Sequence, residues 1–226
     1  MAPHKKAAIS FTGGKDCILA LHRVVDQGFD VAVLVTFCPP TDVEFRSHPL
    51  QIMEQQVRAL GIPHRLCIVQ GPDYLQSYRE NLRQLRLEFG IDSLVTGDVV
   101  PVCSNFMERA VQETGVELVR PLWQCNRLEL LEEIRDRSFQ AAITCIRIRK
   151  FCEEELAIAS IGQDLSLEWI ETVGQGSSGE HGEFHTMVLD APLFVHGKVA
   201  AQIQCSTEDG FAFASVDSVH LSSKLI

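Results

Sequence analysis

The sequence predicts an α/β protein with a doubly wound parallel sheet, followed by a smaller α+β C-terminal domain. In the first half of the 226-residue chain, short apolar runs alternate with helical patterns, which is typical of a parallel sheet connected by crossover helices. A glycine turn follows the first apolar run, as at the ligand-binding strand ends of such sheets. From about Pro121 the pattern changes, so we expect domains at residues 1–120 and 121–226.

The expected strands of the parallel sheet are short apolar runs bounded by glycine, proline or polar residues. Their carboxyl ends should meet at one edge of the sheet, where ligands bind in folds of this class. These runs cover residues 7–11, 31–37, 64–69, 93–96 and 117–119.

The segments between these runs have helical periodicity. Two of them stop at Gly28 and Gly61, and glycine is the residue most often found just after a helix C-terminus. The expected helices cover residues 15–27, 50–60, 74–89 and 104–114.

The second half of the chain mixes short helices and strands. We expect helices at residues 127–137, 153–161 and 164–172. Between the last helix and the next strand lies a stretch rich in glycine and serine, at residues 174–183. The expected strands cover residues 140–148, 184–189, 198–205 and 211–216.

Composition limits the possible partners. The net charge of −10 argues against broad contact with nucleic acid, and the densest basic run, residues 147–150, is short enough to be a strand end. No apolar run approaches the ~20 residues that cross a bilayer, and the first ten residues do not resemble a signal peptide. The 8 cysteines never form C-x-x-C pairs, which favours reduced thiols. We therefore expect a cytoplasmic protein without membrane or nucleic-acid partners.

The glycine turn has the composition of a phosphate-binding loop. Gly13 and Gly14 allow a tight turn with inward N–H groups, and the following helix adds its N-terminal N–H groups. Lys15 can contact a phosphate oxygen, and Asp16 can help to hold Mg²⁺. A strand–turn–helix junction could use the glycines for geometry alone, but the Lys-Asp pair favours nucleotide binding.

The spacing of this loop differs from that of Walker-type loops. It resembles the pyrophosphate loop of ATP pyrophosphatases, although Cys17 stands where serine is usual and a thiol is a weaker donor. We expect ATP and Mg²⁺ at this loop. The expected nucleotide-binding residues are Ser10, Thr12, Gly13, Gly14, Lys15, Asp16, Cys17, Gly97 and Asp98.

Two strand ends should open onto the same edge as the glycine turn. Gly97 and Asp98 follow the fourth run, where Gly97 permits close backbone approach and Asp98 offers either a carboxylate or a helix cap. His48 lies in the long polar segment after the second run. We interpret His48 as a residue of the site, with a solvated loop histidine as the alternative.

A second candidate site lies in the stretch rich in glycine. Glu180 and Glu183 are three residues apart, and His185 follows at the start of a strand-like run. The stretch can be a flexible linker, or its carboxylates can hold Mg²⁺, ammonium or a cationic group of a substrate.

Four stretches together carry a family resemblance. The last of them approaches the pattern G-E-x-G-E-[YF]-x-T. The stretches are residues 12–17, 47–49 with 59–63, 97–98 with 121–123, and 179–186 with 189–192. In this combination the chain resembles the diphthine–ammonia ligase family, within the HUP-like, adenine nucleotide alpha hydrolase type of pyrophosphate-loop proteins.

The resemblance implies an ATP-dependent ligase that forms AMP and pyrophosphate. Such enzymes activate the carboxylate of diphthine, a modified histidine of elongation factor 2, as an acyl-adenylate that ammonia attacks. The implied partners are therefore ATP, ammonium and elongation factor 2, and the sequence does not indicate an oligomeric state. From the glycine turn we assign Lys15 and Asp16 as catalytic residues. We hypothesise that Glu180 and Glu183 are also catalytic, and that the substrate residues are His48, Glu180, Glu183 and His185.

Two alternatives stay open at this point. The chain can be an adenylating or amidating enzyme of the same superfamily that acts on another carboxylate, because relatives also occur in bacteria that make no diphthamide. Many of these ligases carry glutamate at the position of His185. The second alternative is a non-catalytic module that binds adenine nucleotides. Cys17 favours this alternative slightly, and the loop with Glu180, Glu183 and His185 counts against it.

Overall fold

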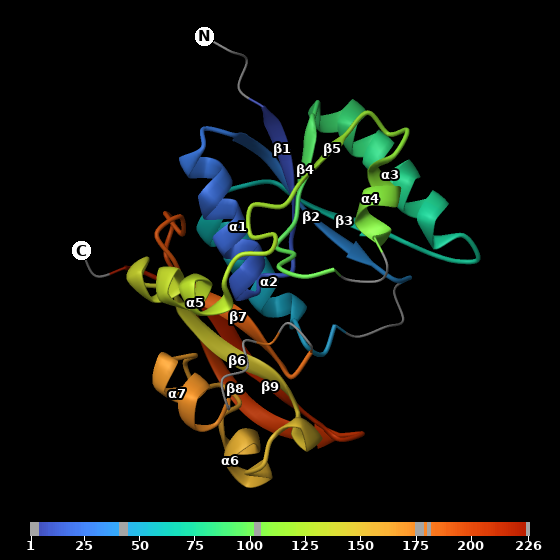
Figure 1. Ribbon diagram of the computed structural model, residues 1–226. Helices are drawn as coiled ribbons and strands as arrows, with labels where there is room; N and C mark the ends of the chain where they lie inside the picture. Colours follow the sequence, from blue (N-terminus) through green and yellow to red (C-terminus); the bar gives the residue numbers. More distant parts are fainter. Residues whose placement is uncertain (1–4, 41–44, 102–104, 175–178, 180–181, 225–226) are drawn as a thin grey trace. The chain divides into compact units, whose positions relative to one another are not determined.

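The computed structural model of the protein describes residues 5–40, 45–101, 105–174, 179 and 182–224 (Figure 1). The chain groups into two compact units. The first unit comprises Met1–Thr12, Asp16–Glu44 and Ile62–Gln124. The second comprises Gly13–Lys15, Phe45–Gly61 and Cys125–Ile226, so two segments from the first half of the chain belong to it.

The first unit is built on a parallel sheet. Its strands lie in the order β3-β2-β1-β4-β5, and every neighbouring pair is parallel. This arrangement, with the antiparallel sheet of the second unit, confirms the predicted fold class. The strands are β1 (Lys6–Ser10), β2 (Asp30–Cys38), β3 (His64–Ile68), β4 (Ser93–Val95) and β5 (Glu117–Val119).

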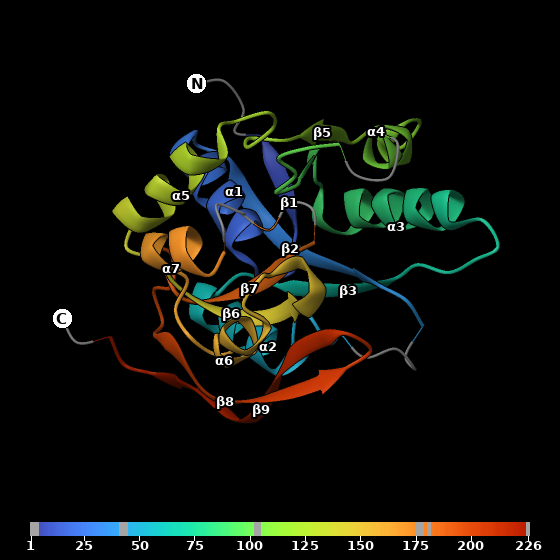
Figure 2. The same cartoon turned by 60° about the horizontal axis from the view of Figure 1, so that its bottom comes forward.

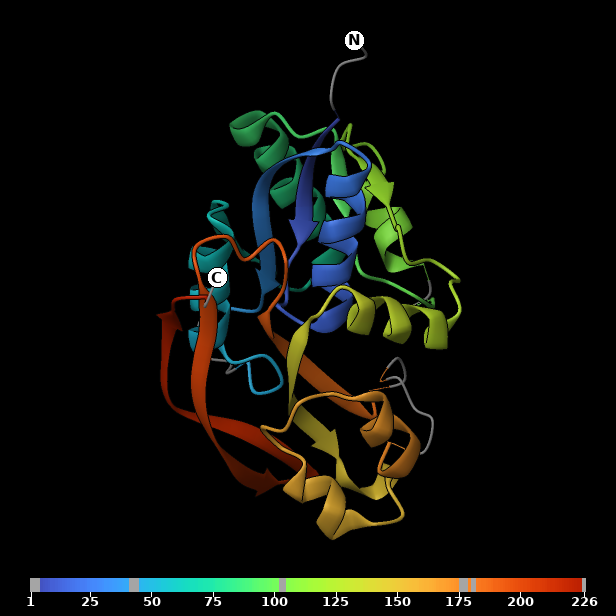
Figure 3. The same ribbon diagram turned by 90° about the vertical axis from the view of Figure 1, so that its left-hand side faces the viewer.

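Helices cover both faces of this parallel sheet. Figures 1 and 3 show α1 (Lys15–Asp26) on one face and α3 (Tyr74–Phe89) on the other, where α4 (Phe106–Val111) also lies. The core between the sheet and α3 contains alternate strand residues such as Leu94, packed against Leu82 of the helix. A helix on each face is what connects parallel strands into a doubly wound sheet.

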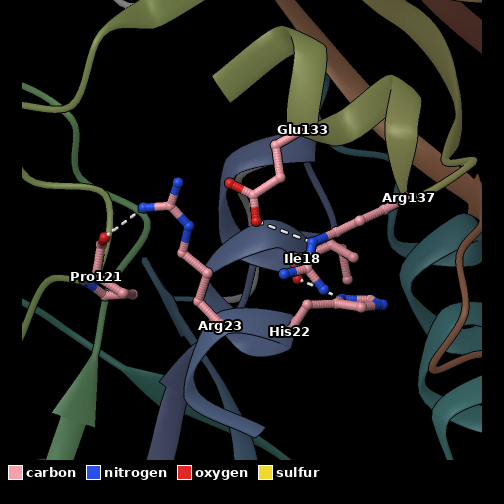
Figure 4. A network of polar contacts seen from close by, with 6 residues as sticks. All are labelled: Ile18, His22, Arg23, Pro121, Glu133 and Arg137. Carbon is pink, nitrogen blue, oxygen red and sulfur yellow. Dashed lines mark hydrogen bonds and ion pairs between the residues drawn. The ribbon is translucent and has the colours of Figure 1, made fainter. Parts of the chain in front are cut away.

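Polar contacts hold α1 within the first unit (Figure 4). Arg23 Nη1 donates to the Pro121 carbonyl oxygen at 2.8 Å, which ties the segment after β5 to the helix. His22 Nδ1 lies 2.8 Å from the Ile18 carbonyl oxygen, so Nδ1 carries the hydrogen in this contact. The segment from Pro121 to Trp123, which contributes to the family resemblance, therefore has a fixed start.

The second unit is built on an antiparallel sheet with strand order β7-β6-β9-β8. Figure 2 shows β8 and β9 as a long hairpin, whose strands pair from Lys198–Ser222 to Glu208–Phe211. The strands are β6 (Gln140–Arg147), β7 (Phe184–Asp190), β8 (Lys198–Glu208) and β9 (Phe211–Ser222).

The helices of the second unit pack on its sheet. Trp169 and Phe184 make an edge contact at 5.0 Å between ring centres, in a core that also contains Ile146 and Ala212. None of the described helices is long and apolar enough to cross a membrane. The helices are α2 (Leu50–Leu60), α5 (Arg127–Asp136), the 3₁₀ helix η1 (Ile148–Lys150), α6 (Glu154–Ala159) and α7 (Leu167–Thr172).

Several elements begin or end away from the expected residues. The strands β8 and β9 continue past residues 205 and 216, because the pairing persists where their outward residues are polar and the apolar pattern stops. The helix expected at 164–172 begins at Leu167, since the Ser166 hydroxyl accepts from the Trp169 N–H at 3.0 Å and caps it. Similarly, α4 ends early because Gln112 takes an extended ψ of 138°.

Candidate active site

Within the second unit, the turn Gly13–Lys15 is held by β7 and α2. The Gly13 carbonyl oxygen accepts hydrogen bonds from the Val188 N–H at 2.9 Å and from Gln56 Nε2 at 2.8 Å. Gln56 Nε2 also donates to the Val188 carbonyl oxygen at 2.7 Å, and the whole side chain is buried. The turn therefore has a defined position on the sheet of its own unit.

Gly13 cannot be replaced without rearrangement. Its φ of +73° lies in the left-handed region, and a Cβ there would lie 2.0 Å from Gln56 Oε1 and 2.8 Å from Met187 Cε. Gln56 Oε1 is buried and has no hydrogen-bond partner among the described residues. Conformation and space both require glycine at this point of the loop.

Lys15 lies beside this turn and is only 5% exposed. Its backbone N–H donates to Thr186 Oγ1 of β7 at 3.2 Å, so the protein itself satisfies one of the N–H groups expected to face phosphate. Its Nζ lies 6.0 Å from the centre of the Phe184 ring. Lys15 is thus largely removed from solvent, where its charge acts more strongly on an anion than it would in water.

Two predicted substrate residues, His48 and His185, come together in the second unit. Their ring centres are 5.0 Å apart and the rings are nearly perpendicular, at 71°. Burial, and then His185, lower the pKa of His48 to about 3. Burial, and then the Lys15 charge, lower the pKa of His185. Both imidazoles are therefore neutral near pH 7.

His48 belongs to a segment that contacts all four strands of the antiparallel sheet, which we call the strap (residues 46–48). At one end His48 lies on His185 of β7. In the middle, the Ser47 carbonyl oxygen accepts a hydrogen bond from Thr144 Oγ1 of β6 at 2.8 Å. Because Thr144 is fully buried, this bond fixes the strap to the sheet.

The other end of the strap lies on β9 and β8. The Arg46 guanidinium lies 5.7 Å from the centre of the Phe213 ring and forms an ion pair with Glu208. In the sheet, Cys145 of β6 is the register partner of both His185 and Phe213. The strap thus follows one row of the sheet, from Phe213 to His185.

In the first unit, Ser10 and the pair Gly97–Asp98 lie at the carboxyl ends of the adjacent strands β1 and β4. A Cβ on Gly97 would lie 2.7 Å from the carbonyl carbon of Asp16 and 2.8 Å from the nitrogen of Cys17. The close backbone approach expected of Gly97 is therefore made to the first turn of α1. These predicted nucleotide residues are neighbours in the structure.

Asp98 lies among polar groups of its own unit. The Thr96 hydroxyl donates to its carboxylate at 2.7 Å. Burial is the largest effect and raises the pKa of Asp98, and the Glu108 charge raises this pKa further. The Thr96 hydrogen bond and the Arg120 charge oppose the rise. Arg120 forms an ion pair with Glu108 at 2.6 Å and lies 3.6 Å over the Trp123 ring. Asp98 is thus a partly buried carboxylate next to a fixed arginine.

Tyr78 is a residue of this region that the sequence analysis missed. Its ring stacks on Phe37 at 3.9 Å and meets the edge of Phe106 at 5.3 Å. Burial and the nearby Asp98 carboxylate raise the pKa of Tyr78, against the effect of a hydrogen bond with Ser10. A tyrosine in an amphipathic helix resembles an ordinary core residue, so its sequence gave no signal of these contacts.

The other predicted residues are less closely grouped. Thr12 is exposed, and Cys17 is buried within the core of its unit. Glu183 is partly exposed, and its carbonyl oxygen accepts from the Arg147 N–H at 2.8 Å. Glu180 lies outside the described residues.

A site for Mg²⁺ would depend on bound phosphate. No group of three or more His, Cys, Asp or Glu side chains within the described part of the chain is arranged to hold a metal ion. Magnesium typically takes one or two carboxylates and completes its shell with phosphate oxygens and water. The single carboxylate of Asp16, in the first turn of α1, fits that kind of site.

Comparison with known proteins gives full-length matches. Residues 5–118 match the family described as diphthamide synthase N-terminal domain, and residues 126–211 match its C-terminal domain. Diphthine–ammonia ligases of Rattus norvegicus and Danio rerio are 22% and 23% identical, and the alignments cover 96% and 94% of this chain and 91% and 95% of theirs. These matches confirm the resemblance drawn from the motifs and the prediction of a ligase that forms a C–N bond.

One solved structure is also similar to this chain. It is described as a predicted subunit of tRNA methyltransferase from Methanocaldococcus jannaschii. The superposition has a TM-score of 0.47 at 15% identity and covers 83% of this chain and 98% of that chain.

Proposed function

Because the chain belongs to the diphthamide synthase family, we propose that it is an ATP-dependent ligase that joins ammonia to a carboxylate. The proposed carboxylate is that of diphthine on elongation factor 2, in line with the name of the rat and zebrafish relatives, diphthine–ammonia ligase. The carboxylate first attacks the α-phosphorus of ATP and releases pyrophosphate. Ammonia then attacks the acyl-adenylate, which leaves the amide and AMP. We place this reaction in the cytoplasm.

The observation that supports this proposal best is the turn Gly13–Lys15. Its position is set by hydrogen bonds from Gln56 and Val188, it has no room for a Cβ, and a buried lysine lies beside it. A glycine turn with an adjacent cation is suited to a polyphosphate. Lys15 would stabilise the charge that develops on the leaving pyrophosphate.

The residues around this turn have proposed roles of their own. Asp16 would hold Mg²⁺, which supplies further positive charge at the phosphates. Ser10 and Asp98, at the ends of β1 and β4, would contact the nucleotide. Glu180 and Glu183 would face the acceptor substrate and the ammonium ion. Each of these assignments is a proposal that mutation can test.

The first test is release of AMP from Mg-ATP and ammonium, with and without elongation factor 2 that carries diphthine. The wild-type protein should release AMP only with that factor. The variant Lys15→Ala should lose about 100-fold or more of the rate, because one charged donor to the leaving group is gone. AMP is measured by chromatography of labelled ATP, and circular dichroism verifies that the variant is folded.

A matched control is Lys150→Ala, which removes an exposed lysine of the same unit and should keep the wild-type rate. AMP that forms without the factor and vanishes in the Lys15 variant would indicate that another carboxylate is the acceptor. Equal rates in wild type and Lys15→Ala, or no AMP under any condition, would contradict the proposal.

A further inference from the structure

His48, His185 and Lys15 place three potentially cationic groups close together within one unit. The two imidazole rings are 5.0 Å apart, and the Lys15 charge acts directly on His185. Lys15 is almost fully buried, and its backbone is fixed to Thr186, the residue next to His185. His185 therefore lies within electrostatic reach of the lysine that would contact the proposed phosphates, and His48 lies against His185.

The surroundings that the protein itself provides disfavour the charged form of both histidines. Burial disfavours the charged form of each ring, and the positive charge of Lys15 disfavours it further at His185. Among the described residues, the other charged or titratable groups near the pair in the chain or in the sheet register are Arg46, Cys145, Arg147 and Glu183. No hydrogen bond or ion pair from a carboxylate to either imidazole occurs among the described residues.

Bound phosphates would reverse this balance. A polyphosphate on the turn Gly13–Lys15 brings several negative charges next to the rings and offsets the charge of Lys15. An opposite charge within about 6 Å favours the protonated imidazole. Binding of the nucleotide and protonation of the histidine pair should therefore be linked.

We propose that His48 and His185 form the general acid for the leaving pyrophosphate. This inference rests on the proposed function. The pair takes up one proton from solvent when the phosphates bind beside Lys15. It then delivers that proton to the pyrophosphate as the bond to the α-phosphorus breaks.

The step balances without a further reactant. A new bond forms between the substrate carboxylate oxygen and the α-phosphorus, and the bond from that phosphorus to the bridging oxygen breaks. The electron pair of the broken bond stays on the pyrophosphate oxygen, which accepts the imidazolium proton. The histidine pair returns to its neutral form, and general acids of this kind typically contribute about 10²–10⁴-fold to rate.

The strap gives this pair a fixed geometry. Ser47 is bonded to Thr144, so the residue before His48 cannot drift from the sheet. His185 is held in β7 by pairing with β6. Two rings positioned by a sheet in this way are better suited to directed proton transfer than histidines on a free loop.

The test is calorimetric titration of the full-length protein with α,β-methylene ATP in buffers of different ionisation enthalpy. The slope of heat against buffer enthalpy gives the number of protons taken up per nucleotide. We expect close to one proton at pH 7 for the wild type, and close to zero for the double variant His48→Gln/His185→Gln. His220→Gln, which changes an exposed histidine of β9, is the control and should behave as the wild type.

The outcomes separate this inference from the proposed function. Nucleotide binding without proton uptake, or uptake that persists in the double variant, would overturn the acid role and leave the ligase proposal intact. No binding of the nucleotide to the folded wild type would overturn the ligase proposal itself. Single variants and thermal melts show whether a loss of uptake comes from a loss of fold.

A second readout is how steeply the reaction rate depends on the basicity of the leaving group. This dependence would not change if the histidines had a purely structural role. Analogues with β,γ-methylene and β,γ-difluoromethylene bridges release bisphosphonates of different basicity. An enzyme without its acid should depend more steeply on that basicity, so the rate ratio between the two analogues should grow at least tenfold in His185→Gln. An unchanged ratio would contradict the proposal.

Discussion

At the scale of single residues, the surroundings and the backbone conformation of Gly13 leave no place for a Cβ. The variant Gly13→Ala adds a Cβ at φ +73° and 2.0 Å from Gln56 Oε1. Left-handed strain and overpacking together should lower the free energy of unfolding by about 2–4 kcal/mol. Urea denaturation of the purified variant measures this loss.

The control for this variant is Gly90→Ala. Gly90 has a similar φ of +68°, but a Cβ there would meet nothing within 4 Å. Gly90→Ala should lower the free energy of unfolding only through backbone strain, by about 1 kcal/mol. Adding Gln56→Ala to the Gly13 variant should relieve part of the clash. If the two substitutions lower the free energy of unfolding by fully additive amounts, the clash with Gln56 is not the cause of the Gly13→Ala loss.

His48 gives the protein a specific dependence of stability on pH. Its pKa is 6.5 in an unfolded chain and about 3 in the folded one, so the unfolded state alone binds a proton between these values. Stability from this residue is fully present above pH 6.5 and declines as the pH falls toward 3. At pH 5 the loss is about 2 kcal/mol.

The measurement compares free energies of unfolding of wild type and His48→Gln at pH 7 and pH 5. Between pH 7 and pH 5 the free energy of unfolding should fall by about 2 kcal/mol less in the variant than in the wild type, because glutamine does not titrate. Parallel declines in the two proteins would mean that His48 is readily protonated in the folded state.

At the scale of elements, the strap shows how one hydrogen bond can position a functional residue. Thr144→Val keeps the shape of the buried side chain but removes the donor to the Ser47 carbonyl oxygen. We expect a loss of about 1–3 kcal/mol in the free energy of unfolding, because a polar group is left without its partner. The His48 pKa should also rise, as seen by NMR titration of its ring protons.

The matched control is Thr172→Val, which removes an exposed hydroxyl bonded to a helix carbonyl of α7. It should change stability by less than about 0.5 kcal/mol and leave the His48 titration as in the wild type. A Thr144 variant that behaves like this control would show that the strap does not depend on its central hydrogen bond.

The helix α2 shows what periodicity can and cannot predict. The spacing of its apolar residues predicted a helix at residues 50–60, and the structure has that helix, with one face buried. Periodicity does not say which sheet covers the face, and α2 packs on the antiparallel sheet although it connects two strands of the parallel one. Gln56, in the middle of this helix, has the polarity of a solvent-facing residue and is fully buried.

For the molecule as a whole, the alternation of strands and helices was enough to predict the parallel sheet and its class. The glycine turn and the Gly97–Asp98 pair could be singled out from the sequence because few residues other than glycine allow close backbone approach, and their role in binding stays a prediction. Gln56 and Thr144 were missed, and so was the contact of Thr186 with Lys15, because these roles depend on contacts between segments far apart in the sequence. Such contacts leave no local pattern in a single chain.

The chain passes from one unit to the other five times, at residues 12/13, 15/16, 44/45, 61/62 and 124/125. When the ribosome has synthesised the first 124 residues, α2 and the glycine turn have been made. The antiparallel sheet on which they pack has not yet been made. Neither unit corresponds to a continuous stretch of gene. Cutting the gene near codon 124 should give two polypeptides that are each incomplete when made alone, and that become a native protein only when they are produced in the same cell.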